Sequence, residues 1–168
     1  MAYDARAIAN HLLNVAAANN ITLSITSLLK ILYFAHGWYL AARGIPLVGQ
    51  KFEAWDHGPV VRVVYDAFKG ESGGPITSRA KYFSALTNCY ETAHAELDPD
   101  HQEFLRGILL SYARFHPYTL SEMTHDPASP WSAIWQKAKT AAVPGMTIPN
   151  EAIRRYFLSQ NRVDSHKT

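Results

Sequence analysis

Apolar residues recur every three or four positions along much of this chain, and the longest such stretch spans residues 28 to 43. Its apolar positions are Leu28, Ile31, Leu32, Ala35, Trp38 or Tyr39, and Ala42. Lys30 and Arg43 fall off this stripe. A period near 3.6 residues predicts a helix that buries one face. Ser24 and Ser27 are candidate N-caps, and Gly44 can end the helix in a left-handed conformation.

The sequence after residue 57 predicts a second helix that begins at Pro59. Proline suits the first helical position because its missing N–H is no loss there, and Gly58 tolerates the unusual backbone that often precedes proline. The predicted inner face is Val60, Val61, Val64, Tyr65 and Phe68. In the connector over residues 45–55, Phe52 and Trp55 alternate with polar neighbours. This pattern predicts a short extended segment that folds Trp55 back onto the two helices.

Other helices are predicted from cap-like residues that precede apolar stripes, and these residues are Asp4, Asp98, Thr119, Ser129 and Asn150. Thr119 and Glu122 have the spacing of a capping box, so Leu120 and Met123 should face inward. Pro99 and Pro130 fit the first helical turn. In the last helix the inner face would be Ile153, Tyr156 and Phe157, with Arg154 and Arg155 outside.

The fold class predicted from this pattern is mainly α, a single compact multi-helix domain with a small β element. Six or seven helices would surround one core, and the domain would span residues 1–158, followed by a polar, frayed tail over 159–168. Residues 76–97 fit a helix or a strand pair with the connector, and we expect a loop plus a short strand. The three glycines and one proline of residues 70–75 predict a flexible loop.

Composition limits the possible functions. The chain has 168 residues, which suits one domain. Its net charge of +2 is too mild to require a nucleic acid partner. A lone cysteine, Cys89, and a start without a basic and apolar leader indicate a cytoplasmic protein. The apolar run of residues 31–42, interrupted by His36 and Gly37, is shorter than the about 20 residues of a membrane span.

Eight histidines raise the question of a metal or catalytic site. No HExxH or CxxC motif is present, and Ser72 lacks the spacing of a nucleophile elbow. His57 follows Asp56 and His125 precedes Asp126, so a metal site that joins the two loops stays open. We favour Asp56 and Asp126 as helix caps and His36 as a packed or interface histidine. No catalytic residue, metal or cofactor is predicted.

The tryptophans allow two interpretations. Most would fill the core, but a half-exposed tryptophan would resemble the aromatic anchors of protein interfaces. The predicted partner-binding residues are Trp38, Trp55, Asp56 and His57, with Trp55 preferred. Residues 119–139 could instead form a helix-turn-helix, because WSAIWQKAK offers Gln136, Lys137 and Lys139 to DNA. Trp131 and Trp135 would occupy the positions that normally read bases, so DNA binding is the weaker alternative.

The strings LLKILYFAHGWYLA and FEAWDHGPVVRVVYDAFKG resemble the signature of the Panacea domain family of antitoxins, which includes SocA-like and phage-associated GepA-like proteins. The resemblance extends from Asp4 to about Phe157. The residues that match its motifs are Lys30, Tyr33, His36, Gly37, Trp38, Trp55, Gly58, Pro59, Val60, Tyr65 and Trp131. One departure is Leu29, where the family commonly has glutamine, and it makes this helix face more apolar.

The resemblance implies an antitoxin of a bacterial or phage toxin-antitoxin system, which neutralises a separately encoded toxin protein by forming a complex with it. Three mechanisms of neutralisation stay open, namely blocking of the toxin's active site, occlusion of a substrate surface, and delivery of the toxin to a protease as an adaptor. Formation of a homo-oligomer also stays open. The alternatives are a DNA-binding regulator or autorepressor and, less favoured, a small hydrolase that uses Asp56, His57 and His125. Such a hydrolase would need these side chains to converge in one pocket.

Overall fold

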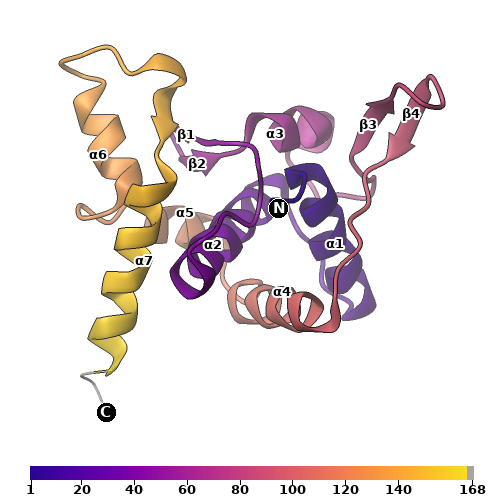
Figure 1. The fold of residues 1–168 in the computed structure, drawn as a ribbon, viewed down its shortest axis with the longest axis horizontal. Coiled ribbons are helices and arrows are strands. Elements are labelled where there is room, and N and C mark those ends of the chain that lie inside the picture. Colours follow the sequence, from indigo (N-terminus) through magenta and orange to yellow (C-terminus); the bar gives the residue numbers. More distant parts are fainter. Residues whose placement is uncertain (166–168) are drawn as a thin grey trace.

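The structure, a computed structural model, describes the backbone of residues 1–165 and the side chains of residues 1–160. It is mainly α, with seven α-helices and two small antiparallel sheets among the described residues. The predicted mainly α composition with a small β element is therefore confirmed. Figure 1 shows α2 (Ile25–Arg43) crossing the centre, with α7 (Asn150–Ser165) and α6 (Pro130–Lys137) on one side and α1 (Ala5–Ala18) on the other.

Helix α2 is the centre of the core and is buried on all sides. Ten consecutive residues, 28 to 37, are all buried. The prediction of one buried face is wrong because α1, α3 (Arg62–Phe68), α4 (Pro99–Tyr112), α5 (Pro117–Thr124) and α7 all contact this helix. The predicted ends are right: Ser24 Oγ accepts from the Ser27 N–H, and Gly44 adopts a φ of 72°.

The close approach of α2 and α7 depends on Gly37. A Cβ at this position would overlap the ring of Phe157, which is buried against α2. The Phe157 ring also packs edge-on against Tyr33 and Trp38, with centroid distances of 5.7 and 4.9 Å. A residue without a side chain is therefore required where the two helices cross.

The helix predicted to start at Pro59 is the main error at the level of the fold. Gly58–Val60 forms strand β2, which pairs with β1 (Phe52–Trp55), and α3 starts only at Arg62, after Val61. Strand β5 (Thr147–Ile148) pairs with the other edge of β1, so the strand order is β2-β1-β5. Pro59 lies opposite Ala54 in the hairpin, and the apolar valines that suggested a helix also suit a buried strand.

Three predicted caps behave differently in the structure. Helix α5 starts at Pro117, and the His116 ring, rather than Thr119, accepts the N-cap hydrogen bond. Ser129 caps α6 as predicted, whereas Asp126 accepts from the Ala128 N–H in the preceding turn and caps no helix. Asp56 lies in the β1–β2 turn, so it caps no helix either.

Side-chain directions were also predicted incorrectly at two positions. Met123 is exposed, although the capping-box argument placed it inside with Leu120, and the N-cap of α5 is His116, three residues before the expected Thr119. Lys30, which falls off the apolar stripe, is only 1% exposed. Leu120, Ile153 and Phe157 are buried as predicted.

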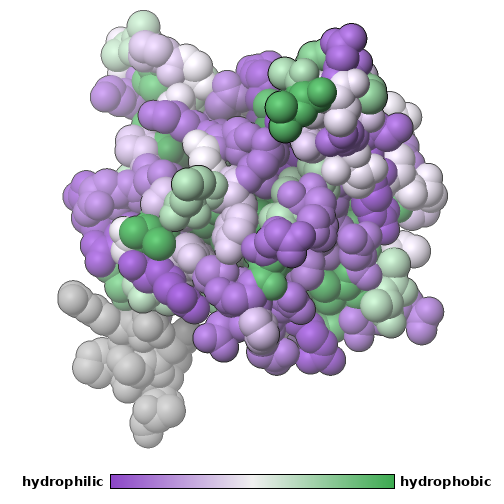
Figure 2. All heavy atoms as spheres, turned by 45° about the vertical axis from the view of Figure 1, so that its right-hand side comes forward, coloured by the Kyte–Doolittle hydropathy of each residue, from purple (hydrophilic) through white to green (hydrophobic). Residues whose placement is uncertain are grey.

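Residues 76–97 form a projecting hairpin of two strands, β3 (Lys81–Ser84) and β4 (Cys89–Thr92). The expected loop plus a short strand is instead a pair of strands, and these pair with each other rather than with the connector, which was the alternative. The hairpin stands out from the helices at the upper right of Figure 1. In Figure 2, where that side comes forward, green apolar groups gather on the part that projects at the upper right of the view.

The C-terminal helix extends beyond the predicted domain boundary at residue 158, since α7 continues to Ser165. Residues 166–168 lie outside the described part of the chain, and the frayed state of residues 159–168 stays a prediction. None of the helices in residues 1–165 combines the length and the apolar character that crossing a membrane requires.

Candidate functional site

The turn between β1 and β2 presents two charged residues to solvent. Trp55 pairs with Gly58 at the end of the hairpin, so Asp56 and His57 form a two-residue turn. Their side chains are 78% and 86% exposed, and His57 Nε2 lies 3.9 Å from Asp56 Oδ2. The turn therefore offers one acidic and one titratable group, with little bonding to the rest of the domain.

Trp55 lies beside this turn with its indole held in one orientation. The ring is half-buried and packs edge-on against Tyr65, at a centroid distance of 4.8 Å. The Arg62 guanidinium lies 5.1 Å from the indole centroid, and Glu53 accepts from the indole N–H at 3.2 Å. Aromatic packing and a cation–π contact fix the ring before any partner arrives.

The other side of the hairpin is held by Trp131 at the start of α6. Its indole N–H donates to the backbone oxygen of Trp55 at 2.7 Å. Its ring stacks on His125 and on Trp135, with centroid distances of 4.1 and 5.3 Å. Trp131 is buried, so it serves the core and positions the hairpin rather than reaching for a partner.

Lys30 lies beneath the hairpin as a buried cation. Its Nζ donates to the Pro59 oxygen at 2.9 Å, and burial lowers the pKa of the ammonium to about 7. Gly58 makes room for it: the φ of this residue is +118°, and a Cβ here would lie 2.8 Å from Lys30 Cε and 2.6 Å from Thr124 Oγ1. Only glycine fits this position, in both conformation and space.

Two hollows flank the turn and share the residues Thr26 and His57. The first has a volume of about 140 Å³, and its lining is Ile25, Thr26, Leu29, Lys30, Trp55, Asp56, His57, Val60 and Tyr65. The second has a volume of about 370 Å³ and is bordered by α5 residues that include Tyr118, Glu122 and His125. We call Trp55, Asp56, His57 and these two hollows the hairpin-tip surface.

His57 and His125 line the second hollow, whereas Asp56 lines only the first, so the three side chains that a hydrolase would use do not share one hollow. Burial is the main cause that lowers the pKa of His125, and the positive charges of Lys30 and His57 add to it. No hydrogen bond joins either imidazole to a hydroxyl group among the described side chains, so a nucleophile and base pair is not formed there. Nor do three metal-binding side chains come together among them.

Trp38, the other predicted partner-binding tryptophan, lies away from the hairpin-tip surface. It follows Lys30 by eight residues, which is about 12 Å along a helix. Its indole N–H donates to Tyr112 Oη at 2.7 Å. Trp38 lines a separate, mostly apolar hollow of about 570 Å³ between α2 and α4. The four predicted partner-binding residues therefore belong to two surfaces, and three of them share the hairpin tip.

The remaining motif residues of α2 are structural. His36 is fully buried, its Nδ1 accepts from the Val48 N–H, and its Nε2 lies 2.9 Å from Asn150 Oδ1. Burial lowers the pKa of His36, so the neutral ring is favoured. The prediction of a packed histidine is confirmed. Tyr33 is also buried, and burial raises the pKa of its phenol.

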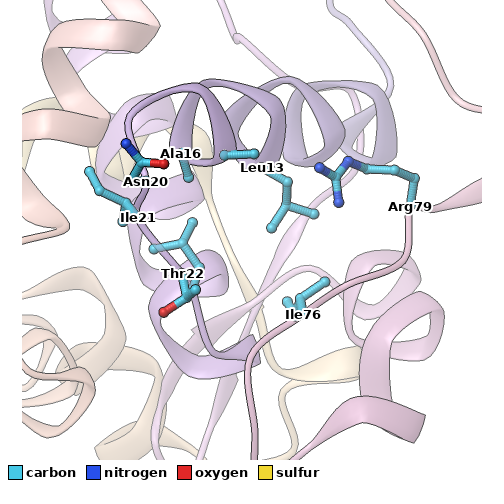
Figure 3. Close-up of a pocket in the computed structure, with 9 residues that line it drawn as sticks. Leu13, Ala16, Asn20, Ile21, Thr22, Ile76 and Arg79 are labelled. Carbon is cyan, nitrogen blue, oxygen red and sulfur yellow. The ribbon is translucent and has the colours of Figure 1, made fainter.

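Two further regions have fewer features of a functional site. Figure 3 shows a hollow of about 340 Å³ at the end of α1, where Leu13, Ala16, Ile21 and Ile76 face a single charged side chain, Arg79. The Arg79 guanidinium already donates to Asn14 and to the backbone oxygen of Ser78. On α6 and the turn that follows it, the residues proposed for DNA contact, Gln136, Lys137 and Lys139, are exposed.

Sequence reasoning missed Lys30 as part of this site and joined His125 to His57 only in the metal-site and hydrolase alternatives. The signal for Lys30 was its place in a run of apolar residues, LLKILYF, where a lone lysine is unusual in a helix that reads as buried. The position of His125 beside His57 depends on the stacking with Trp131 and on α5 starting at Pro117.

Comparison with known proteins places these features in context. The sequence model of the family described as "Antitoxin SocA-like, Panacea domain" matches residues 28–132, which include α2 from Leu28 onward, both hairpins and the start of α6. Antitoxin SocA of Caulobacter vibrioides (strain NA1000 / CB15N) is 37% identical over 157 residues, which cover 94% of this chain and 84% of that protein. No solved structure was found to match the chain.

Proposed function

Because this chain belongs to the SocA-like family of Panacea domain antitoxins, we propose that it is an antitoxin that neutralises a cognate protein toxin by binding it directly. The observation that carries this proposal is the 37% identity to Antitoxin SocA over 94% of the chain. The system would be of bacterial or phage origin, and the partner would be the product of a neighbouring gene.

The hairpin-tip surface supports a binding role. Tight protein interfaces depend on a few rigid aromatic anchors surrounded by polar residues, and truncation of such an anchor costs about 2 to 4 kcal/mol of binding. Trp55 has this character, since its ring is half-buried and held by Tyr65, Arg62 and Glu53. The exposed turn residues Asp56 and His57 would then form part of the polar rim.

We propose binding rather than catalysis as the activity of the domain. Of the side chains that a hydrolase would use, His57 and His125 line the second hollow and Asp56 lines only the first, and a hydrogen-bonded order of nucleophile, base and orienting group is not seen among the described side chains. An enzyme would also need a group that stabilises the developing charge. A binding surface needs only the fixed aromatic and polar groups described above.

The test is to express the neighbouring open reading frame with and without this chain. We expect a growth defect in the absence of this chain and relief in its presence. Toxin levels measured in the same cultures separate blocking, which leaves the toxin abundant, from delivery to a protease, which removes it. If the neighbouring gene causes no defect, or if this chain does not relieve it, the antitoxin proposal is wrong.

The interface can be placed with matched variants. Asp56→Ser with His57→Ser removes an exposed charged pair at the hairpin tip, and Glu103→Ser with Arg106→Ser removes an exposed pair on α4. We expect the first to reduce relief of growth and the second to leave it unchanged. Trp55→Ala should abolish relief while circular dichroism still shows a folded domain. Full relief with a folded Trp55→Ala variant would place the interface elsewhere.

A further inference from the structure

The hollow beneath the β1–β2 hairpin contains the amino group of Lys30, which has no anionic partner among the described side chains. Lys30 is 1% exposed and its Nζ donates to one backbone oxygen, that of Pro59. An ammonium has three N–H donors, so one hydrogen bond leaves two of them free to bind another group. No ion pair of Lys30 is found among the side chains of residues 1–160, and burial alone accounts for its lowered pKa.

The hollow beside Lys30 has the size of one side chain. Its volume of about 140 Å³ is well below the about 300 to 1,000 Å³ of sites for small molecules. Its walls are mainly apolar, formed by Ile25, Leu29, Val60 and Tyr65, with Trp55 beside them. An occupant that fits would carry a short apolar stem and one polar end.

The charge of Lys30 determines which polar end fits. A cation removed from water gains most from an anion placed against it, because the attraction grows as the dielectric constant falls. Asp56 lines the same hollow, but its carboxylate points to solvent with 78% of the side chain exposed. The side chains of residues 1–160 therefore supply no carboxylate that pairs with Lys30.

We propose that Lys30 and this hollow form a receptor for one carboxylate side chain, an aspartate or glutamate, presented by the bound protein partner. This inference rests on the proposed function, since the partner is the toxin. Trp55 and the exposed turn would surround the inserted side chain, and its carboxylate would take the free donors of Lys30. The contact would be desolvated and central, as the strongest contacts of interfaces are.

A first experiment needs no toxin. Butyrate is the probe, because it has the carboxylate and the short apolar stem of a glutamate side chain. The pKa of Lys30 is followed through its 13Cε resonance with increasing butyrate, while His57, His125 and Asp56, the titratable groups around the hollow, are assigned separately. We expect saturable binding with a Kd on the order of millimolar and a rise of at least one unit in the pKa of Lys30.

Three controls make this experiment decisive. Butyramide, which has the same shape without the charge, should cause no rise. Exposed Lys81 should titrate identically with and without butyrate. Lys30→Met should lose saturable binding, and Lys30→Gln, which keeps a donor for the Pro59 oxygen, guards against misfolding of the methionine variant. If butyrate leaves the pKa of Lys30 unchanged, the receptor proposal is overturned.

A second experiment tests the partner. We expect folded Lys30→Gln to weaken the complex with the product of the neighbouring gene at least 30-fold and to reduce relief of growth. Wild-type affinity in that variant would overturn the role of Lys30 in the complex while the antitoxin function stands. If the wild-type protein gives no relief of growth at all, the proposed antitoxin function and the assignment of the toxin as partner are both wrong. The butyrate titration still tests whether Lys30 and the hollow bind a carboxylate.

Discussion

The two β-hairpins of this domain have similar lengths and opposite surroundings. The β1–β2 hairpin contacts α2, α5 and α6 and pairs with β5, so all but its turn is enclosed. The β3–β4 hairpin pairs only with itself and projects into solvent, with Leu86 99% and Tyr90 71% exposed. The local sequence forms a hairpin in both cases. The packing of the surrounding helices decides whether that hairpin is enclosed, as β1–β2 is, or projects as an arm, as β3–β4 does.

The difference extends to the bonds that hold each hairpin. Trp131 and Lys30 donate to the backbone oxygens of Trp55 and Pro59, so two side chains from distant elements fix the β1–β2 hairpin along its length. The β3–β4 hairpin is held at its base by Asn10, which bonds to Ala80 and Ala93. An element fixed along its length is rigid up to its turn, whereas one held at its base can move as a unit.

The largest expected effect is that of Gly58→Ala in the enclosed hairpin. Alanine at a φ of +118° is strained, and its Cβ would meet Thr124 Oγ1 at 2.6 Å and Lys30 Cε at 2.8 Å. Strain of about 1 to 3 kcal/mol plus the overlap should lower the free energy of unfolding by about 3 to 5 kcal/mol. Urea denaturation followed by circular dichroism measures this change.

A matched glycine provides the control. Gly70 has no atom within 4 Å of the position that a Cβ would take, and it lies in the short 3-10 helix Lys69–Glu71 that follows α3. We expect Gly70→Ala to change the free energy of unfolding by less than about 0.5 kcal/mol. Equal effects of the two substitutions would mean that the β1–β2 hairpin is not packed as described.

The sequence was sufficient to predict most of the helices but not the two hairpins. Helix starts at Asp4, Ser24, Asp98 and Ser129 were found because a capping side chain acts within its own turn. At Gly58 and Pro59 the same local rules pointed to a helix. Residues 58–60 form a strand because residues 52–55 pair with them. A capping residue gives no information about such a pairing partner.

The candidate site was predicted in part for the same reason. Trp55, Asp56 and His57 are neighbours in sequence, so their common surface follows from any turn at this point. Lys30 joins them only because α2 is enclosed on every side, which a stripe of apolar residues does not reveal. Distant packing therefore decides which charged residue enters a site.

Asn10→Ala should have the next largest effect and should act on the projecting hairpin. The Asn10 side chain makes three hydrogen bonds to buried backbone groups of Ala80 and Ala93. Unpaired buried groups cost about 1 to 3 kcal/mol each, so we expect a loss of about 3 kcal/mol. Hydrogen exchange should show faster exchange in residues 81–92 than in β1 and β2.

Asn14 offers a matched control for Asn10 one helical turn along α1. Its side chain is exposed and accepts only from Arg79 Nε. Asn14→Ala should therefore change stability by less than about 0.5 kcal/mol. If Asn10→Ala were equally mild, the hairpin would not depend on this anchor.

The enclosed hairpin should also give the domain a pH dependence that the arm lacks. The pKa of Lys30 falls from 10.5 to about 7 on folding, so between these values the unfolded chain binds more protons and stability rises with pH. From pH 7 to pH 9 the gain should be about 2 kcal/mol. Lys30→Met should remove this gain, since no proton is then bound there in either state.

This window is chosen so that other groups interfere little. The pKa values of Tyr33 and Tyr156 are raised by burial, so their effect on stability begins only near pH 10 and has the opposite sign. His125, whose pKa is lowered, titrates mainly below pH 7. A flat stability curve for the wild-type protein between pH 7 and pH 9 would show that Lys30 is not desolvated.

The smallest expected effect on stability is at the exposed face of the projecting hairpin. Phe83 and Tyr90 lie opposite each other with ring centroids 5.5 Å apart, and such a cross-strand aromatic pair is worth about 0.5 to 1 kcal/mol. Phe83→Thr should cost about that much in urea denaturation, because threonine keeps the β propensity while removing the ring. Relief of toxicity measured with the same variant then compares the two hairpins directly. If Phe83→Thr gives full relief and Trp55→Ala gives none, the toxin binds the enclosed β1–β2 hairpin. If Trp55→Ala gives full relief and Phe83→Thr gives none, the toxin binds the projecting β3–β4 hairpin.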